Sequence, residues 1–135
     1  MKSASAVIDA SVVVRATVEQ DGAAQDWLQA VASGKVAGHV PDLIWLEYAN
    51  ALTRCVRQAV TSAEEAREML ELALQLPLTA WPLGQLAVAA FAVSVERGLS
   101  AYDASYVVLA EAHDATLVTA DRRLATAYDR VELLA

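Results

Sequence analysis

Short runs of apolar residues alternate along the chain with longer stretches in which apolar residues recur every three or four positions. The short runs are typical of buried β-strands, and the longer stretches are typical of amphipathic helices. Such alternation predicts an α/β domain with a mainly parallel sheet of about four or five strands. The predicted strands are 4–8, 36–40, 78–81, 116–119 and 131–134, and the predicted helices are 11–19, 22–32, about 41–60, 62–76, 83–97, 100–113 and 121–128.

Residues with known preferences at helix ends support these boundaries. Asp21 is a suitable N-cap for the second helix. Pro41 suits the first turn of the third helix, where a missing N–H costs nothing. Two overlapping capping boxes between residues 61 and 65 predict the start of the fourth helix. Gly98 is a natural C-terminal stop for the helix that begins near Leu83.

A chain of 135 residues fits one domain, 1–135, and is long enough to bury a core without disulfides. Its single cysteine, Cys55, suits a reducing cytoplasm and reads best as a small buried thiol. Asp9 interrupts the early apolar run, so we do not interpret that run as a signal peptide. The apolar stretch 83–95 is too short to span a bilayer, so we expect no membrane segment.

Charge and hydrophobicity bear on the partners of the protein. The formal net charge is −7, which is the wrong sign for ordinary contacts between basic side chains and phosphate. Divalent cations bound to carboxylates would offset part of that charge where a phosphate would lie. Hydrophobic residues make up 56% of the chain, which is rich for a small domain and suggests that a partner covers some apolar surface.

Two aspartates follow predicted strands directly. Asp9 ends the first strand, and Asp121 comes just after the strand 116–119. Ligands of open parallel sheets bind beyond the carboxyl ends of the strands, so both positions favour a functional site. The structural alternative is that each aspartate simply caps the helix that follows it.

Two further acids lie on predicted helices. Asp103 stands three residues after Ser100, so a near capping box explains it as well as a functional role does. Glu47 is harder to explain structurally, because its neighbours one turn away along the helix are apolar and place it on or beside the apolar stripe. A buried carboxylate without a partner is costly, so a metal ion or an arginine is expected beside it, unless it lies at a solvated rim.

Four carboxylates brought together would raise some of each other's pKa values unless cations neutralise them. Hard oxygen ligands suit Mg²⁺ or Mn²⁺. The implied chemistry is metal-assisted hydrolysis of phosphodiesters with one or two ions, which needs no protein nucleophile.

The sequence lacks the residues that other kinds of catalytic or binding site would need. His39 and His113 have no partner at zinc-ligand spacing, and the five glycines form no phosphate-binding loop. Ser11 lacks the flanking glycines of a nucleophile elbow. An aspartyl-phosphate mechanism at Asp9 is disfavoured, since Ser11 stands where a second aspartate is usual and no lysine follows Lys35.

Four segments together resemble the PIN-domain family, and within it the VapC-type toxins of toxin–antitoxin pairs. The resemblance covers essentially the whole chain. Its segments are Val-Ile-Asp9-Ala-Ser11, Pro41-x5-Glu47-x2-Asn50-x-Leu52, Leu99-Ser100-x-Tyr102-Asp103-Ala104-x-Tyr106 and Leu117-Val118-Thr119-x-Asp121-x2-Leu124.

The resemblance implies a three-layer α/β/α fold in which the strands bearing Asp9 and Asp121 are neighbours. It implies that Asp9, Glu47, Asp103 and Asp121 form a catalytic metal site, and that Ser11 and Thr119 support the metal ligands or phosphate. It also implies cleavage of RNA to a 3′-hydroxyl and a 5′-phosphate, homodimerisation, and inhibition by a small cognate antitoxin.

Several polar residues are candidates for substrate contacts or support of the site. Arg15 follows Ser11 by one helical turn, and Arg122 and Arg123 follow Asp121. Arg54 shares a helix with Glu47, and Asn50 faces the same way as Glu47. Solvated surface polarity is the structural alternative for each.

Two wider questions stay open at this point. A PIN-like module that binds RNA or protein without cleaving is the rival function, although such a module has no reason to keep four costly acids. A housekeeping nuclease is the rival to a toxin. A homodimer is expected from apolar helices around Trp27, Leu70 and Leu74.

Overall fold

The computed structural model describes residues 4–135, so the first three residues of the expected domain 1–135 lie outside the description. Five strands form one sheet in the order β3-β2-β1-β4-β5, and every neighbouring pair is parallel. The expected parallel α/β sheet is therefore confirmed. The strands are β1 (Ala4–Ile8), β2 (Val36–Pro41), β3 (Leu78–Trp81), β4 (Thr116–Thr119) and β5 (Val131–Leu133).

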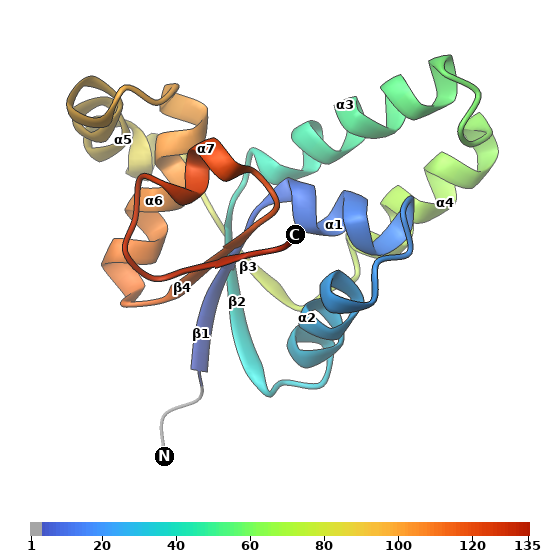
Figure 1. Cartoon of the computed structure of the whole chain (residues 1–135), viewed down its shortest axis with the longest axis horizontal. Helices are drawn as coiled ribbons and strands as arrows, with labels where there is room; N and C mark the ends of the chain where they lie inside the picture. Colours follow the sequence, from blue (N-terminus) through green and yellow to red (C-terminus); the bar gives the residue numbers. More distant parts are fainter. Residues whose placement is uncertain (1–3) are drawn as a thin grey trace.

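Within residues 4–135, seven helices cover the two faces of this sheet and complete a three-layer α/β/α fold (Figure 1). Helices α1 to α4 lie on one side of the sheet, and helices α5 to α7 lie on the other. The helices are α1 (Ala10–Thr17), α2 (Gly22–Ala32), α3 (Ile44–Arg57), α4 (Ala63–Ala73), α5 (Leu83–Arg97), α6 (Ala101–His113) and α7 (Arg122–Ala125).

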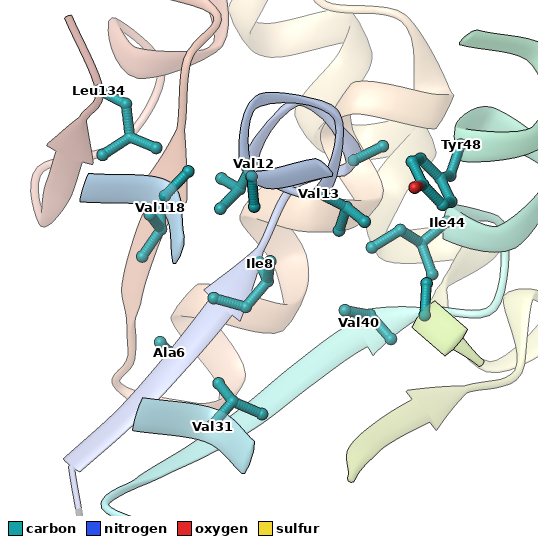
Figure 2. Close-up of a cluster of buried hydrophobic side chains, with 14 of the residues drawn as sticks. Ala6, Ile8, Val12, Val13, Val31, Val40, Ile44, Tyr48, Val118 and Leu134 are labelled. Carbon is teal, nitrogen blue, oxygen red and sulfur yellow. The ribbon is translucent and has the colours of Figure 1, made fainter. Parts of the chain in front are cut away.

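Each face of the sheet carries its own hydrophobic core. On one face, Ile8 and Val40 of the sheet pack with Val12, Val13 and Tyr48 of α1 and α3 (Figure 2). On the other face, Val7 of β1 and Leu117 of β4 pack with the buried residues of α5 and α6. Because β1 and β4 are buried on both faces, the residues in their middle form apolar runs that can be recognised in the sequence.

The two aspartate-bearing strands lie side by side in the middle of the sheet. Ile8 pairs with Val118, and the backbone N–H of Asp9 donates to the Val118 carbonyl at 3.0 Å. The expectation that these strands are neighbours is confirmed. Their carboxyl ends therefore deliver Asp9 and the segment after Thr119 to one edge of the sheet.

The predicted start of the third helix is wrong by three residues. Pro41 pairs with Trp81 as the last residue of β2, and α3 begins only at Ile44. The Asp42 N–H donates to the Trp81 carbonyl at 2.9 Å, so pairing with β3 holds the chain extended beyond the proline. The helix also ends at Arg57, three residues before its predicted end.

The predicted helix 121–128 is too long. Helix α7 spans Arg122–Ala125, and the Tyr128 hydroxyl instead donates to the carbonyls of Ala110 and Ala115. These tertiary bonds draw the chain toward α6 and β4, which ends the helix. The other elements agree with prediction to within three residues. Asp21, Ser62 and Gly98 take their predicted capping positions.

Large apolar side chains are exposed on α3, α4, α5 and α6, and three of those on α5 form a row. Val88, Phe91 and Val95 are 85%, 67% and 72% exposed and follow one face of that helix. Trp27 and Leu70 pack partly buried against the first core, whereas Leu74 is exposed. Cys55 is half-buried. Within residues 4–135, no helix has the length and apolar character needed to cross a membrane.

Candidate active site

The four predicted acids line one cavity of about 620 Å³ at the carboxyl edge of the sheet. Each comes from a different part of the fold. Asp9 follows β1, Glu47 lies on α3, Asp103 is in the first turn of α6, and Asp121 is the N-cap of α7. Residues spread over more than a hundred positions are thus gathered at one place.

Asp9 is buried at the base of this cavity, with 8% of its surface exposed. Its side chain makes no capping bond to α1, so capping does not explain it. Instead its Oδ2 accepts from Ser11 Oγ at 2.6 Å and from Thr119 Oγ1 at 2.8 Å. Burial raises the pKa of the carboxyl, against the opposing effect of the two hydroxyl donors.

The same two hydroxyls fasten Asp9 to the segment that carries Asp121. Ser11 Oγ accepts from the Ala120 N–H at 2.9 Å, and Thr119 Oγ1 accepts from the Asp121 N–H at 3.0 Å. Thr119 is fully buried. Ser11 and Thr119 therefore fix the relative position of two of the acids through four hydrogen bonds.

Asp121 both caps a helix and lines the cavity. Its Oδ1 caps α7 by accepting from the N–H groups of Arg123 and Leu124, at 2.9 and 3.3 Å. Among residues 4–135 no donor reaches the second oxygen, Oδ2. Capping thus orients the carboxyl and leaves one oxygen available to the cavity.

Asp103 is likewise a helix-start residue that lines the cavity. Its N–H donates to the Ser100 hydroxyl at 3.0 Å, so the predicted cap is present. Burial raises the pKa of its carboxyl, and the negative charge of Asp121 raises it further. The two carboxylates are therefore close enough to repel one another.

Glu47 is half-buried and faces the cavity from α3. The buried Tyr106 hydroxyl donates to its Oε1 at 2.5 Å. Burial raises the pKa of Glu47, the Tyr106 bond lowers it, and the charges of Asp9 and Asp103 raise it. Tyr106 was not among the predicted site residues. Its spacing of three from Asp103, which puts both on one face of α6, was the available signal.

The predicted supporting residues divide into two groups. Arg15 and Asn50 line the cavity, and so does Arg54. The Arg15 guanidinium also donates to the Ala135 carbonyl at 2.6 Å and pairs with Glu19 at 3.3 Å. Arg122 is exposed and does not line the cavity, so its predicted contact role finds no support.

Arg123, the neighbour of Arg122, does not line the cavity either, but its charge influences Asp103. Its guanidinium donates to the Gly98 carbonyl at 3.0 Å, and its charge lowers the pKa of Asp103.

The four carboxylates share the cavity without converging on one point. Among residues 4–135, no three His, Cys, Asp or Glu side chains already stand in an arrangement that would hold a metal ion. Repulsion between like charges opposes such convergence, and hydroxyl or backbone donors hold Asp9, Glu47 and Asp121 where they are.

The family model of the PIN domain matches residues 6–130, which make up nearly the entire chain. The chain belongs to the PIN domain family. This PIN domain is 38% identical over 118 residues to VapC ribonuclease Mb0985 of Mycobacterium bovis, with 87% of each chain covered. It is 32% identical over 121 residues to ribonuclease VapC3 of Pyrobaculum aerophilum, covering 88% of this chain and 91% of the relative.

Solved structures agree with the PIN fold. PAE2754 from Pyrobaculum aerophilum superposes with a TM-score of 0.76 at 27% identity, over 97% of this chain and 91% of that one. VapBC2 from Rickettsia felis, bound to a promoter DNA fragment, superposes with a TM-score of 0.67 at 14% identity, over 96% and 98% of the two chains. The predicted family and fold are thus confirmed.

Proposed function

We propose that this PIN domain is a metal-dependent endoribonuclease, the toxin of a toxin–antitoxin pair, with Asp9, Glu47, Asp103 and Asp121 as its acidic centre. The observation that carries the proposal is the gathering of these four side chains around one cavity of about 620 Å³. Relatives at 32–38% identity that are named VapC ribonucleases support the activity.

The residues of the cavity fit a divalent cation. All four acids offer hard carboxylate oxygens, the donors preferred by Mg²⁺ and Mn²⁺. Burial raises the pKa values of Asp9, Glu47 and Asp103, and a cation would relieve the unfavourable burial of their charges. When bound, the ion would activate water and stabilise charge on the phosphate and the leaving oxygen.

The remaining residues prepare the site for this reaction. Ser11 and Thr119 hold Asp9 in a fixed orientation, and the cap of α7 does the same for Asp121. Arg15 and Arg54 lie along the α1 and α3 walls of the cavity, where cationic side chains suit a polyanionic strand. Hydrolysis at such a centre would leave a 3′-hydroxyl and a 5′-phosphate. The proposal implies that the protein meets its RNA in the cytoplasm.

The test is cleavage of a mixed, structured RNA pool by the purified protein with Mg²⁺, with Mn²⁺ and with EDTA. Asp9→Asn is the site variant, and Asp26→Asn, on the exposed surface of α2, is the matched control. We expect cleavage that requires metal, is lost in Asp9→Asn and is retained in Asp26→Asn. Full metal-dependent cleavage by a folded Asp9→Asn variant would overturn the site assignment.

The alternative is a module that binds RNA or protein without cleaving. The acids argue against it, because crowded and buried carboxylates cost stability that a pure binding surface does not need. RNA binding by the folded protein, without cleavage in Mg²⁺ or Mn²⁺, would favour that alternative.

A small antitoxin is the partner that we propose. The solved structures with this fold include a toxin–antitoxin complex from Klebsiella pneumoniae. An apolar groove of about 370 Å³ lies between α3 and α4, with Leu52, Val56 and Leu70 in its lining and Arg57 and Arg67 beside them. A segment with apolar and acidic residues would suit this groove. We expect the product of a short adjacent reading frame to copurify with the protein and to inhibit it, and Leu70→Asp to weaken the complex.

The homodimer also remains a proposal. The exposed face of α5 formed by Val88, Phe91 and Val95 supports it better than the helices around Trp27 and Leu70 do, because those two residues pack against the core. Sedimentation at micromolar concentration tests it, and a monomer there would contradict it.

A further inference from the structure

Tyr106 contacts the acidic site although it is not one of the four acids. Its side chain is fully buried in the core between the sheet and α6, where it packs with the cluster that contains Val7, Leu109 and Leu117. A ring fixed in this way has a phenolic oxygen with a fixed location. A buried phenol also needs a hydrogen-bond partner, because an unpaired hydroxyl in the interior is costly.

That partner is Glu47, 59 residues away on a different helix. The Tyr106 O–H donates to Glu47 Oε1, and no other side-chain hydrogen bond joins α3 to α6 in the part of the chain described. A tyrosine phenol keeps its proton at physiological pH, so it can serve as a donor to the carboxylate.

Glu47 has less support from the rest of the fold than Asp9 and Asp121 have. Asp9 is buried and held by two hydroxyls, and Asp121 is held by two backbone N–H groups. Glu47 has a longer side chain with three rotatable bonds, and Tyr106 is its sole hydrogen-bond donor among residues 4–135. The bond occupies Oε1 and leaves Oε2 free to face the cavity.

We propose that Tyr106 is a positioning residue that orients the Glu47 carboxylate for the divalent cation. The inference rests on the proposed metal-dependent function. Partners of this kind, which hold a ligand without touching the ion, generally change metal affinity or activity about 10–100-fold when removed.

The matched experiment compares two buried tyrosines. Tyr48 is also fully buried, but its hydroxyl pairs with Thr17 Oγ1 at 2.8 Å rather than with an acid (Figure 2 labels Tyr48 in its core). Tyr106→Phe and Tyr48→Phe therefore remove the same group from similar surroundings. Mn²⁺ binding is measured by titration calorimetry on wild type and both variants, and RNA cleavage is followed across a range of Mn²⁺ concentrations.

We expect Tyr106→Phe to weaken Mn²⁺ binding about 10-fold and to recover much of its cleavage rate at high Mn²⁺. Tyr48→Phe should bind Mn²⁺ as the wild type does. In the Glu47→Gln background, Tyr106→Phe should cause little further loss of affinity, because the two residues act as one unit.

Each contrary result has a distinct meaning. Equal Mn²⁺ affinity in the two phenylalanine variants, or additive losses in the Glu47→Gln background, would overturn the role of Tyr106. A wild-type protein that neither binds Mn²⁺ nor cleaves RNA would instead overturn the proposed function on which this inference rests.

Discussion

Replacing Thr119 by valine removes a hydroxyl and keeps the shape of the side chain. Thr119 Oγ1 donates to Asp9 Oδ2 at 2.8 Å and accepts from the Asp121 N–H at 3.0 Å, and the residue is fully buried. Thr119→Val opens no cavity, so its effect isolates these two bonds. Thr119→Ser is the matched control, since it keeps the hydroxyl and loses only a methyl group.

The size of the effect follows from the two bonds. A hydrogen bond to a charged group contributes about 1.5–3 kcal/mol, and an N–H left without a partner costs about 1–3 kcal/mol. Asp9 keeps its bond from Ser11, so we expect the free energy of unfolding to fall by about 3 kcal/mol, near the low end of that sum. For a domain of this size the melting temperature should fall by about 10 °C. The serine control should lose about 1 kcal/mol.

The loss should depend on pH in a defined direction. The Thr119 bond favours the ionised form of Asp9, so removing it raises further a pKa that burial already raises. A carboxyl group whose pKa is higher in the folded protein than in the unfolded chain stabilises the fold while it is protonated. That stabilisation is lost as the pH rises through the folded-state pKa. The difference between wild type and Thr119→Val should therefore be larger at about pH 8 than at about pH 5.

Urea unfolding of metal-free protein, followed by circular dichroism at both pH values, measures these differences. A loss that is the same at both values, or a valine variant as stable as the serine variant, would refute the role assigned to the Thr119 hydroxyl.

Three other outcomes are expected. The free energy of unfolding of Asp121→Asn should lie within about 0.5 kcal/mol of the wild-type value, because asparagine caps a helix about as well as aspartate. The same variant should lose most metal-dependent cleavage, and wild-type cleavage rates would contradict this. Burial raises the pKa of Asp9, so metal-free wild type should gain stability relative to Asp9→Asn as the pH is lowered from about 8 to about 5. Free energies of unfolding that change with pH in the same way for both proteins would contradict this. Phe91→Asp should yield a monomer in sedimentation if the α5 face joins two copies, with an unchanged dimer counting against that face.

Local sequence signals predicted much of this protein. The periods of the apolar residues gave the strands and helices, because burial on one face of a helix or both faces of a strand imposes those periods. The capping residues at Asp21, Ser62 and Gly98 fixed helix ends through bonds or backbone conformations that span a few residues. Acids at the ends of buried strands, together with the family resemblance, pointed to the four carboxylates.

Tertiary structure alone decided which side chains meet. Thr119 bonds Asp9 from 110 residues away, and Tyr106 bonds Glu47 from 59 residues away, distances over which a sequence period carries no information. Pairing with β3 kept Pro41 in a strand, although a proline in a helical first turn is locally just as acceptable. Local geometry is set by backbone sterics and nearest neighbours, whereas the contacts of the site depend on how complete layers pack against one sheet.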